Sequence, residues 1–114
     1  MQQQETTRQQ KIASLIKRDI ADIFLREASD KVSGALVSVT KVRVSPDLSF
    51  AKVYVSVFPF DKAPMIEQKL KEGSSMIRGA LGVRVGKQLR IVPELSFRID
   101  DSMEYVEKIE RLIK

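Results

Sequence analysis

Residues 42–57 read Val-Arg-Val-Ser-Pro-Asp-Leu-Ser-Phe-Ala-Lys-Val-Tyr-Val-Ser-Val. Two runs rich in β-branched residues flank Ser-Pro-Asp-Leu-Ser, whose residue types are typical of turns. After the turn, apolar residues alternate with Lys52, Tyr54 and Ser56, which is the pattern of a strand with one buried face. The stretch therefore predicts an antiparallel hairpin in a sheet that is covered on one side only.

The first strand of this hairpin is expected over residues 35–44, with one irregularity. Val37 and Val39 share one phase of the strand, whereas Val42 and Val44 share the other. A β-bulge inserts one extra residue and restores the phase, so we expect either a bulge near Thr40 or a half-buried start of the strand.

Helices are expected on both sides of the hairpin. Residues 7–28 carry apolar side chains three and four positions apart, which predicts an amphipathic helix. A second helical pattern begins near residue 61, has Pro64 in its first turn and fades between residues 86 and 89. Gly73-Ser74-Ser75 interrupts it, and glycine costs about 1 kcal/mol inside a helix, so we expect a kink or two helices joined at an angle.

A third strand is expected over residues 90–99, with Ile91, Leu95, Phe97 and Ile99 facing the core. Pro93 has no N–H for a ladder, so it is expected at an edge, at a bulge or at the start of this strand. The run Asp100-Asp101-Ser102 would then cap a last helix. The buried stripe expected for that helix is Met103, Val106, Ile109, Leu112 and Ile113.

The predicted order is α-β-β-α-α-β-α, an α+β two-layer sandwich with a three-stranded sheet and helices on one face. The chain has 114 residues and no internal repeat, so we expect one domain over residues 1–114, with residues 1–6 frayed.

The composition excludes several classes of chemistry. The chain has no Cys and no His, so disulfides, zinc fingers, thiolate nucleophiles and imidazole bases are impossible. The polar N-terminus contains no secretory signal, and no apolar run reaches the ~20 residues of a membrane helix. We expect a cytoplasmic protein without a cofactor, a metal or a membrane partner.

Positive charge is concentrated in the middle of the chain, and the net charge is +5. Between residues 73 and 93 the basic residues are Arg78, Arg84, Lys87 and Arg90, with no acidic residue among them. A basic segment without carboxylates is typical of a surface that binds phosphate, and its glycines allow close approach to the backbone. The alternative is an ordinary solvated face at the end of a helix.

Three further patterns are weaker. Gly79-Ala-Leu-Gly82 matches the GxxG of KH domains but falls inside a predicted helix. Asp100, Asp101 and Glu104 form an acidic cluster that fits a helix cap better than a magnesium or acid–base site. Tyr54 has no second aromatic residue placed beside it for stacking on bases.

The basic positions of the first predicted helix leave two interpretations open. They are interrupted by Asp19 and Asp22, so either phosphate contact or a solvated face of mixed charge is compatible with them. The basic residues in question are Arg8, Lys11, Lys17 and Arg18.

The chain resembles the ribosome-binding factor A family of bacterial small-subunit maturation factors over residues 7–114. The resemblance is carried by residues 8–16, by the hairpin at 42–57, by Met76-Ile-Arg78 and by residues 87–97. Its most specific part is Leu-Arg-Ile-Val-Pro-Glu-Leu at 89–95, followed by Asp-Asp-Ser. The family has an Ala-x-Gly kink where this chain has Gly73, Ser74 and Ser75, and many relatives carry a C-terminal tail that is not expected here.

The resemblance implies a KH-like fold of the second type and a non-enzymatic, monomeric assembly factor with no small-molecule substrate. The implied partners are the small ribosomal subunit and its 16S rRNA during late 30S maturation. It also implies a role in 16S rRNA 5′-end processing and in growth in the cold. The expected RNA-binding residues are Arg43, Lys52, Ser74, Ser75, Arg78, Arg84, Lys87 and Arg90.

Two other functions remain as alternatives. The first is a protein–protein module in an RNA-processing complex, which would dock a partner on an exposed sheet edge or on the last helix. The second is a small hydrolase that uses Asp100, Asp101 and Glu104, although these residues lack a nucleophile–base pair.

Overall fold

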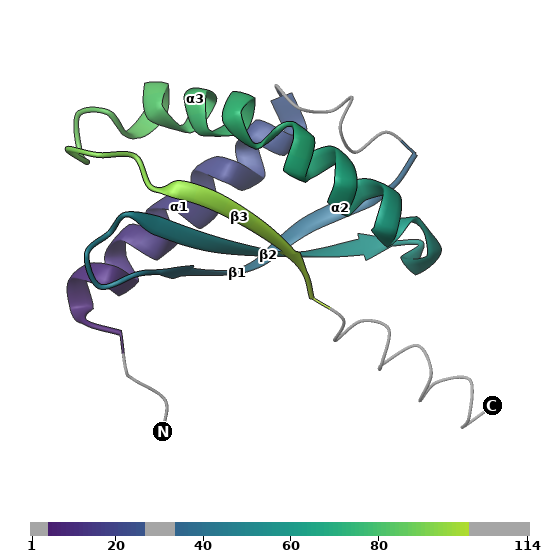
Figure 1. Cartoon of the computed structure of the whole chain (residues 1–114), viewed down its shortest axis with the longest axis horizontal. Helices are drawn as coiled ribbons and strands as arrows, with labels where there is room; N and C mark the ends of the chain where they lie inside the picture. The colour runs from purple at the N-terminus through teal and green to yellow at the C-terminus, as the bar shows by residue number, and fades with distance from the viewer. Residues whose placement is uncertain (1–4, 27–33, 101–114) are drawn as a thin grey trace.

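A computed structural model describes residues 5–26 and 34–100, which form a three-stranded sheet with helices packed on one face (Figure 1). The strands are β1 (Leu36–Val44), β2 (Phe50–Phe58) and β3 (Glu94–Ile99), and β2 lies in the centre. β1 pairs with β2 in antiparallel register, and β3 pairs with β2 in parallel register. The predicted α+β two-layer architecture and the hairpin are confirmed.

The helices are α1 (Thr7–Arg26), α2 (Ala63–Glu72) and α3 (Ser74–Val85), and the short 3-10 helix η2 (Phe60–Lys62) precedes α2. α1 packs mainly against β1, whereas α2 and α3 pack against β3. Within the described ranges, no helix is long and apolar enough to cross a membrane. The last predicted helix, from Met103 onward, lies outside the described residues.

The bulge expected near Thr40 is confirmed. Val39 pairs with Val55 and Lys41 pairs with Tyr54, so the register shifts by one residue between them. Thr40 is the extra residue, and its side-chain oxygen lies 3.3 Å from the Tyr54 carbonyl oxygen while its proton is donated to the Asp100 carboxylate (2.7 Å). Because of this shift, the valines on both sides of the bulge face the helices.

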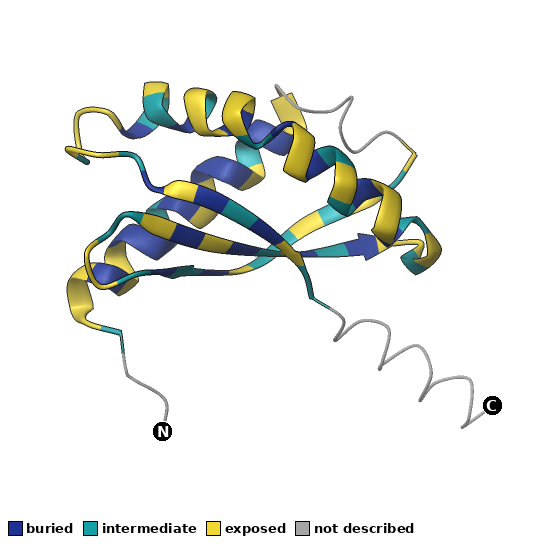
Figure 2. Ribbon diagram, in the orientation of Figure 1, coloured by how far each residue is buried: buried dark blue, intermediate teal, exposed yellow. Residues whose placement is uncertain are grey.

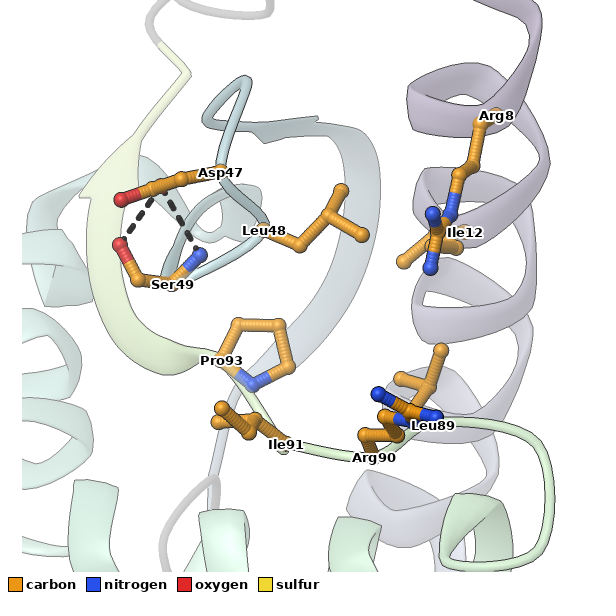
Figure 3. Close-up of a pocket in the computed structure, with 9 residues that line it drawn as sticks. All are labelled: Arg8, Ile12, Asp47, Leu48, Ser49, Leu89, Arg90, Ile91 and Pro93. Carbon is orange, nitrogen blue, oxygen red and sulfur yellow. Dashed lines mark hydrogen bonds between the residues drawn. The ribbon is translucent and has the colours of Figure 1, made fainter.

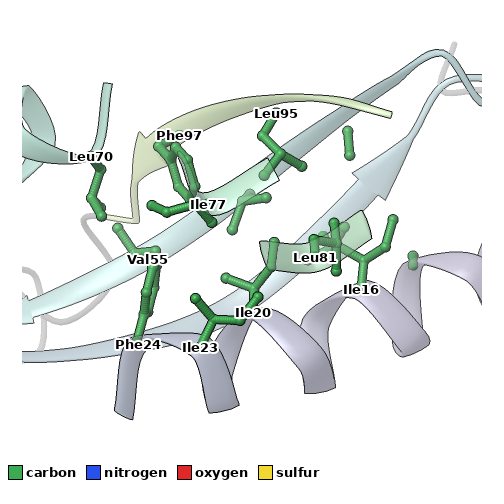
Figure 4. Packing of buried hydrophobic residues seen from close by; sticks show 14 of the residues in the cluster. Ile16, Ile20, Ile23, Phe24, Val55, Leu70, Ile77, Leu81, Leu95 and Phe97 are labelled. Atoms are coloured by element: carbon green, nitrogen blue, oxygen red, sulfur yellow. The ribbon is translucent and has the colours of Figure 1, made fainter. Parts of the chain in front are cut away.

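The core lies between the helices and the inner face of β2 (Figures 2 and 4). Ile16, Ile20 and Ile23 of α1 are fully buried, as expected from the spacing of the apolar residues in this helix. Phe24 of α1 and Phe97 of β3 contact each other with ring centroids 6.2 Å apart. The first helix and the last strand of the described residues therefore share one core.

The N-terminus of α1 is held by a capping box. Thr6 N–H donates to the Gln9 side chain (2.8 Å), and Gln9 N–H donates back to the Thr6 hydroxyl (3.1 Å). The buried Gln9 amide also donates to the carbonyl of Val44 at the end of β1 (2.9 Å). One glutamine thus both caps α1 and fixes it to the sheet, so the position of Arg8 relative to the hairpin turn is set.

The interruption at Gly73 separates two helices, as expected. Gly73 is both the C-cap of α2 and the N-cap of α3, and its N–H donates to the Lys69 carbonyl (2.9 Å). Ile77 N–H donates in turn to the Gly73 carbonyl (3.0 Å). Figure 1 shows that the two helices change direction at this point.

The predicted start of the third strand is wrong. β3 begins at Glu94, not at residue 90, and Pro93 lies immediately before it. Ile91 was expected in the core, but its side chain is 69% exposed. The reason is that residues 91–93 lie beyond the ladder, where the chain still runs from α3 toward the sheet.

The turn of the hairpin is organised around the Asp47 carboxylate. Its Oδ1 accepts hydrogen bonds from the Ser45 hydroxyl (2.7 Å) and from the Ser49 hydroxyl and N–H (2.7 and 3.1 Å). These bonds, above all that from the Ser49 side chain, lower the pKa of Asp47 below its ordinary value of 3.8. The ionised form is therefore the one that stabilises the turn.

We expect Asp47→Asn to lower the thermal midpoint of unfolding at neutral pH, and this loss to shrink as the pH falls. A carboxyl whose pKa is lower in the folded state stabilises the fold above its unfolded pKa, near 3.8, and loses that effect as the pH falls through the folded value. Thermal unfolding of both proteins between pH 7 and pH 3 measures the difference. Asp61→Asn removes the same charge without those hydrogen bonds and is the control. A difference that stayed constant with pH would contradict this role.

Candidate nucleic-acid interface

A groove of about 370 Å³ lies between α3 and the segment that leads into β3. It is lined by Ser75, Arg78, Gly79, Gly82 and Val92. Gly79 and Gly82, which match a GxxG pattern, lie inside α3 as expected. A side chain at Gly79 would meet nothing within 4 Å, whereas one at Gly82 would contact the Val92 side chain at 3.4 Å. Gly82 lets the segment approach the helix, and Gly79 leaves bare backbone at the groove.

Arg78 extends across this groove to the other wall. Its guanidinium donates to the Val92 carbonyl (2.7 and 3.2 Å) and to the Pro93 carbonyl (3.2 Å). These acceptors are neutral, so they orient the guanidinium without cancelling its charge. The side chain is positioned in advance and remains exposed, which is the arrangement required for a phosphate contact.

Arg84 has a different environment. It turns toward α1, where its Nη1 lies 2.6 Å from the Asp22 carboxylate, and its side chain is 25% exposed. Asp22 also accepts a hydrogen bond from Arg26 (2.8 Å), and the bonds from Arg26 and Arg84 lower the pKa of the Asp22 carboxyl. The charge of Arg84 is thus neutralised by a carboxylate that connects α3 to α1.

Lys87 and Arg90 lie in the connection between α3 and β3, and both are exposed. Neither forms an ion pair with any residue in the described part of the chain. Arg90 lines a pocket together with Arg8 of α1 (Figure 3). Sequence reasoning left Arg8 and Lys11 undecided, because their approach to this connection depends on how α1 packs.

Arg43 and Lys52 are neighbours across β1 and β2 on the open face of the sheet. Arg43 lies 3.8 Å from the Glu5 carboxylate, whereas Lys52 is exposed. The same face carries Lys41, whose ammonium lies 6.0 Å from the ring centroid of Tyr54. The expected RNA-binding residues are therefore divided between two surfaces, the α3 side and the open sheet face.

The acidic cluster lies only in part within the described residues. Asp100 accepts a hydrogen bond from the Thr40 hydroxyl (2.7 Å) and so binds the bulge of β1. Asp101 and Glu104 lie outside the described residues. In the described ranges, no group of three potential metal-ligating side chains comes together.

Comparison with known proteins identifies the family. The family model of ribosome-binding factor A matches residues 8–113. This chain belongs to the ribosome-binding factor A family. Ribosome-binding factor A of Christiangramia forsetii is 46% identical over 114 residues, which cover 97% of this chain and 86% of that protein. The protein of the same name from Flavobacterium psychrophilum is also 46% identical, over 96% of this chain and 85% of the relative.

Solved structures agree with this assignment. The crystal structure of ribosome-binding factor A from Thermus thermophilus has a TM-score of 0.67 and 25% identity, and the match covers 80% of this chain and 94% of that one. A homology model of Thermus thermophilus ribosome-binding factor A, fitted into the cryo-EM map of a complex of that protein with 30S, has a TM-score of 0.61 and 27% identity, over 78% and 91% of the two chains. The expected KH-like fold is consistent with these similarities.

In this member of the ribosome-binding factor A family, the α2–α3 junction leads directly into the groove. Gly73 is buried at the junction, Ser74 is half-buried and Ser75 is exposed where it lines the groove. The junction therefore places the Ser75 hydroxyl on the α3 wall of the groove, from which Arg78 extends to the opposite wall.

We expect Arg84→Gln to lower the thermal midpoint of unfolding, because it breaks the ion pair between α3 and α1. Lys87→Gln removes the same charge from an exposed position and should change the free energy of unfolding by no more than about 0.5 kcal/mol. Thermal denaturation of the two variants and of Asp22→Asn measures this, and Asp22→Asn should resemble Arg84→Gln. Equal stability of all three would show that the α1–α3 ion pair does not hold the helices together.

Proposed function

We propose that this chain is a non-enzymatic assembly factor that binds 16S rRNA of the small ribosomal subunit during late 30S maturation. In this role it supports maturation of the 5′ end of that RNA and growth in the cold. It acts as a cytoplasmic monomer, without a cofactor or a small-molecule substrate. The observation that carries the proposal is Arg78, which backbone carbonyls hold across the groove beside the bare backbone of Gly79, and which forms no ion pair with a carboxylate of residues 5–26 or 34–100.

The charge distribution supports a polyanionic partner. Arg78, Lys87 and Arg90 follow one another from α3 into its exit and are exposed, without a carboxylate partner among the described residues. Exposed cations of this kind can neutralise the phosphates of a nucleic-acid backbone, and such binding weakens with salt. The family relationship adds that a member from Thermus thermophilus has been placed in a 30S complex. We assign RNA contact chiefly to Ser75, Arg78, Lys87 and Arg90, and a structural role to Arg84.

The proposed biological role is tested by depletion. Cells without the protein should accumulate precursor small-subunit RNA with an unprocessed 5′ end, more strongly in the cold. Restoring the wild-type gene should remove the precursor, whereas a gene with Arg78, Lys87 and Arg90 all changed to Gln should not. Mature RNA at normal levels at both temperatures would contradict the proposal.

We expect each of Arg78→Gln, Lys87→Gln and Arg90→Gln to flatten the salt dependence of binding to small subunits. Each phosphate contact contributes a slope of about 0.7–0.9 in log affinity against log salt. Cosedimentation at several salt concentrations measures the slopes, with Lys17→Gln as the control, since Lys17 is exposed on α1 and lines none of the described grooves. A protein–protein module would instead bind with little dependence on salt in every variant.

Gly79→Ala should affect stability and binding in opposite directions. Alanine is favoured over glycine by about 0.5–1 kcal/mol inside a helix, and the open space beside Gly79 accepts a methyl group, so the free protein should become more stable. The same methyl group lies where RNA backbone would approach, so binding to small subunits should weaken. Val83→Ala, at a side chain that is 88% exposed on the same helix, is the control for binding. Unchanged binding by Gly79→Ala would exclude close approach of RNA at this position.

A further inference from the structure

A second pocket is lined in part by the same chain segment that forms a wall of the groove (Figure 3). Val92 lines the α3 groove, whereas its neighbours Ile91 and Pro93 line this pocket. The opposite walls are the start of α1, with Ile12, and the hairpin turn, with Leu48. Three segments that are far apart in the sequence thus converge on one opening.

The size and lining of the pocket suit one flat, largely apolar group. Its volume is about 170 Å³, well below the roughly 300–1,000 Å³ of sites for drug-sized ligands and cofactors. An apolar cavity of about 150 Å³ is large enough for a benzene ring. Ile91 is 69% exposed although it is a large apolar residue, so the lining is open to a ligand.

Charge is distributed unevenly around this opening. Figure 3 shows the side chains of Arg8 and Arg90 on one side and Asp47 on the other, with Leu48 and Pro93 between them. In the described part of the chain, neither arginine has a carboxylate within 4.0 Å. The hydrogen bonds to Asp47 favour its ionised form, so the far side of the pocket is anionic. A ligand must therefore bring negative charge to the arginine side only.

The wall formed by Leu48 is maintained at an energetic cost. Leu48 has φ of 65°, a left-handed conformation that a branched side chain rarely adopts. The turn enforces it, since Leu48 N–H donates to the Ser45 carbonyl (2.9 Å) and Ser45 N–H donates to the Phe50 carbonyl (2.9 Å). A glycine would relieve the strain but would remove the apolar wall. Such strain is typical of sites where the side chain has a use.

We propose that this pocket holds one unpaired RNA base, while Arg8 and Arg90 bind the phosphates next to it. The inference rests on the proposed function and deepens it by naming a nucleotide subsite. Arginine planes stack on unpaired bases, and apolar side chains line pockets that hold an extruded base. A peptide is the weaker choice, because a chain end brings one carboxylate, whereas an RNA strand brings a phosphate for each cation. A further groove, which shares Arg8, Ile12 and Leu89 with the pocket, is also lined by Lys11. Lys11 therefore provides a third cation for the RNA strand.

The test compares two kinds of small probe, which differ in whether they carry a base. The full chain is titrated with each nucleoside 5′-monophosphate and with ribose 5-phosphate, and binding is followed by NMR chemical shifts. At least one monophosphate should bind about fivefold or more tightly than ribose 5-phosphate, which is the fold-change expected from burying about 40 Å² of apolar base surface at roughly 25 cal/mol per Å². The largest methyl shifts should fall on Leu48, Leu89 and Ile91.

Matched variants separate the base from the phosphate. Ile91→Ser should remove the advantage of the base, whereas Val83→Ser, at another exposed apolar residue, should leave it intact. Arg8→Gln should weaken the binding of the monophosphates and of ribose 5-phosphate by the same factor. Lys17→Gln should leave the binding of both kinds of probe unchanged. Lys17 is nine residues after Arg8 in α1 and therefore lies on the opposite side of the helix.

The outcomes distinguish this inference from the proposed function. Equal affinity for the two probes, or shifts away from the pocket, would overturn the nucleotide subsite while binding to small subunits could persist. Tighter binding of N-acetyl-leucine than of any monophosphate would also overturn it, in favour of a peptide. Failure of the wild-type chain to cosediment with small subunits would refute the proposed function itself, whatever the pocket binds.

Discussion

The inner face of β2 is the surface on which the rest of the molecule depends. Ala51, Val53, Val55 and Val57 are at most 2% exposed, and the strand is paired on both edges. Each helix buries its apolar stripe directly or indirectly against this face. This burial of apolar surface is the main contribution to the stability of a sheet that is covered on one side. Because β3 runs parallel to β2, the chain must cross from one end of the sheet to the other, and α2 and α3 form this crossover.

The crossover explains where the candidate interface lies. The connection out of α3 has to reach the end of the sheet at which β2 begins, which is also the end with the hairpin turn. The capping box and Gln9 fix the start of α1 at the same end. Residues 86–93 are thereby brought between α3 on one side and α1 with the turn on the other. A single short segment therefore forms a wall of both the groove and the neighbouring pocket.

The cations at this end of the molecule are distinguished by their acceptors. Arg84 is bound by a carboxylate and connects two helices, whereas Arg78 is bound by neutral carbonyls and keeps its charge. A carboxylate and a phosphate compete for the same guanidinium. The carboxylate at Arg84 therefore makes this arginine part of the fold, whereas the guanidinium of Arg78 stays available to a phosphate. Positive charge on the open sheet face forms a separate surface, since the sheet itself separates it from the helices. Family membership is compatible with contacts from either surface.

Much of the fold followed from local patterns in the sequence. Alternation in β2, the phase change near Thr40, the spacing in α1 and the interruption at Gly73 each report the local environment of a few residues, so these predictions were confirmed. The start of β3 and the exposure of Ile91 were mispredicted, because apolar residues before Pro93 look like a strand unless the ladder partner is known. The basic segment was visible as a composition, but the carboxylate beside Arg84 and the approach of Arg8 to Arg90 were not. Asp22 and Arg84 are separated by 62 positions in the sequence, and Arg8 and Arg90, which line one pocket, are separated by 82. The packing of α1 against α3 and against the α3–β3 connection brings each pair to one place, and no local pattern encodes that packing.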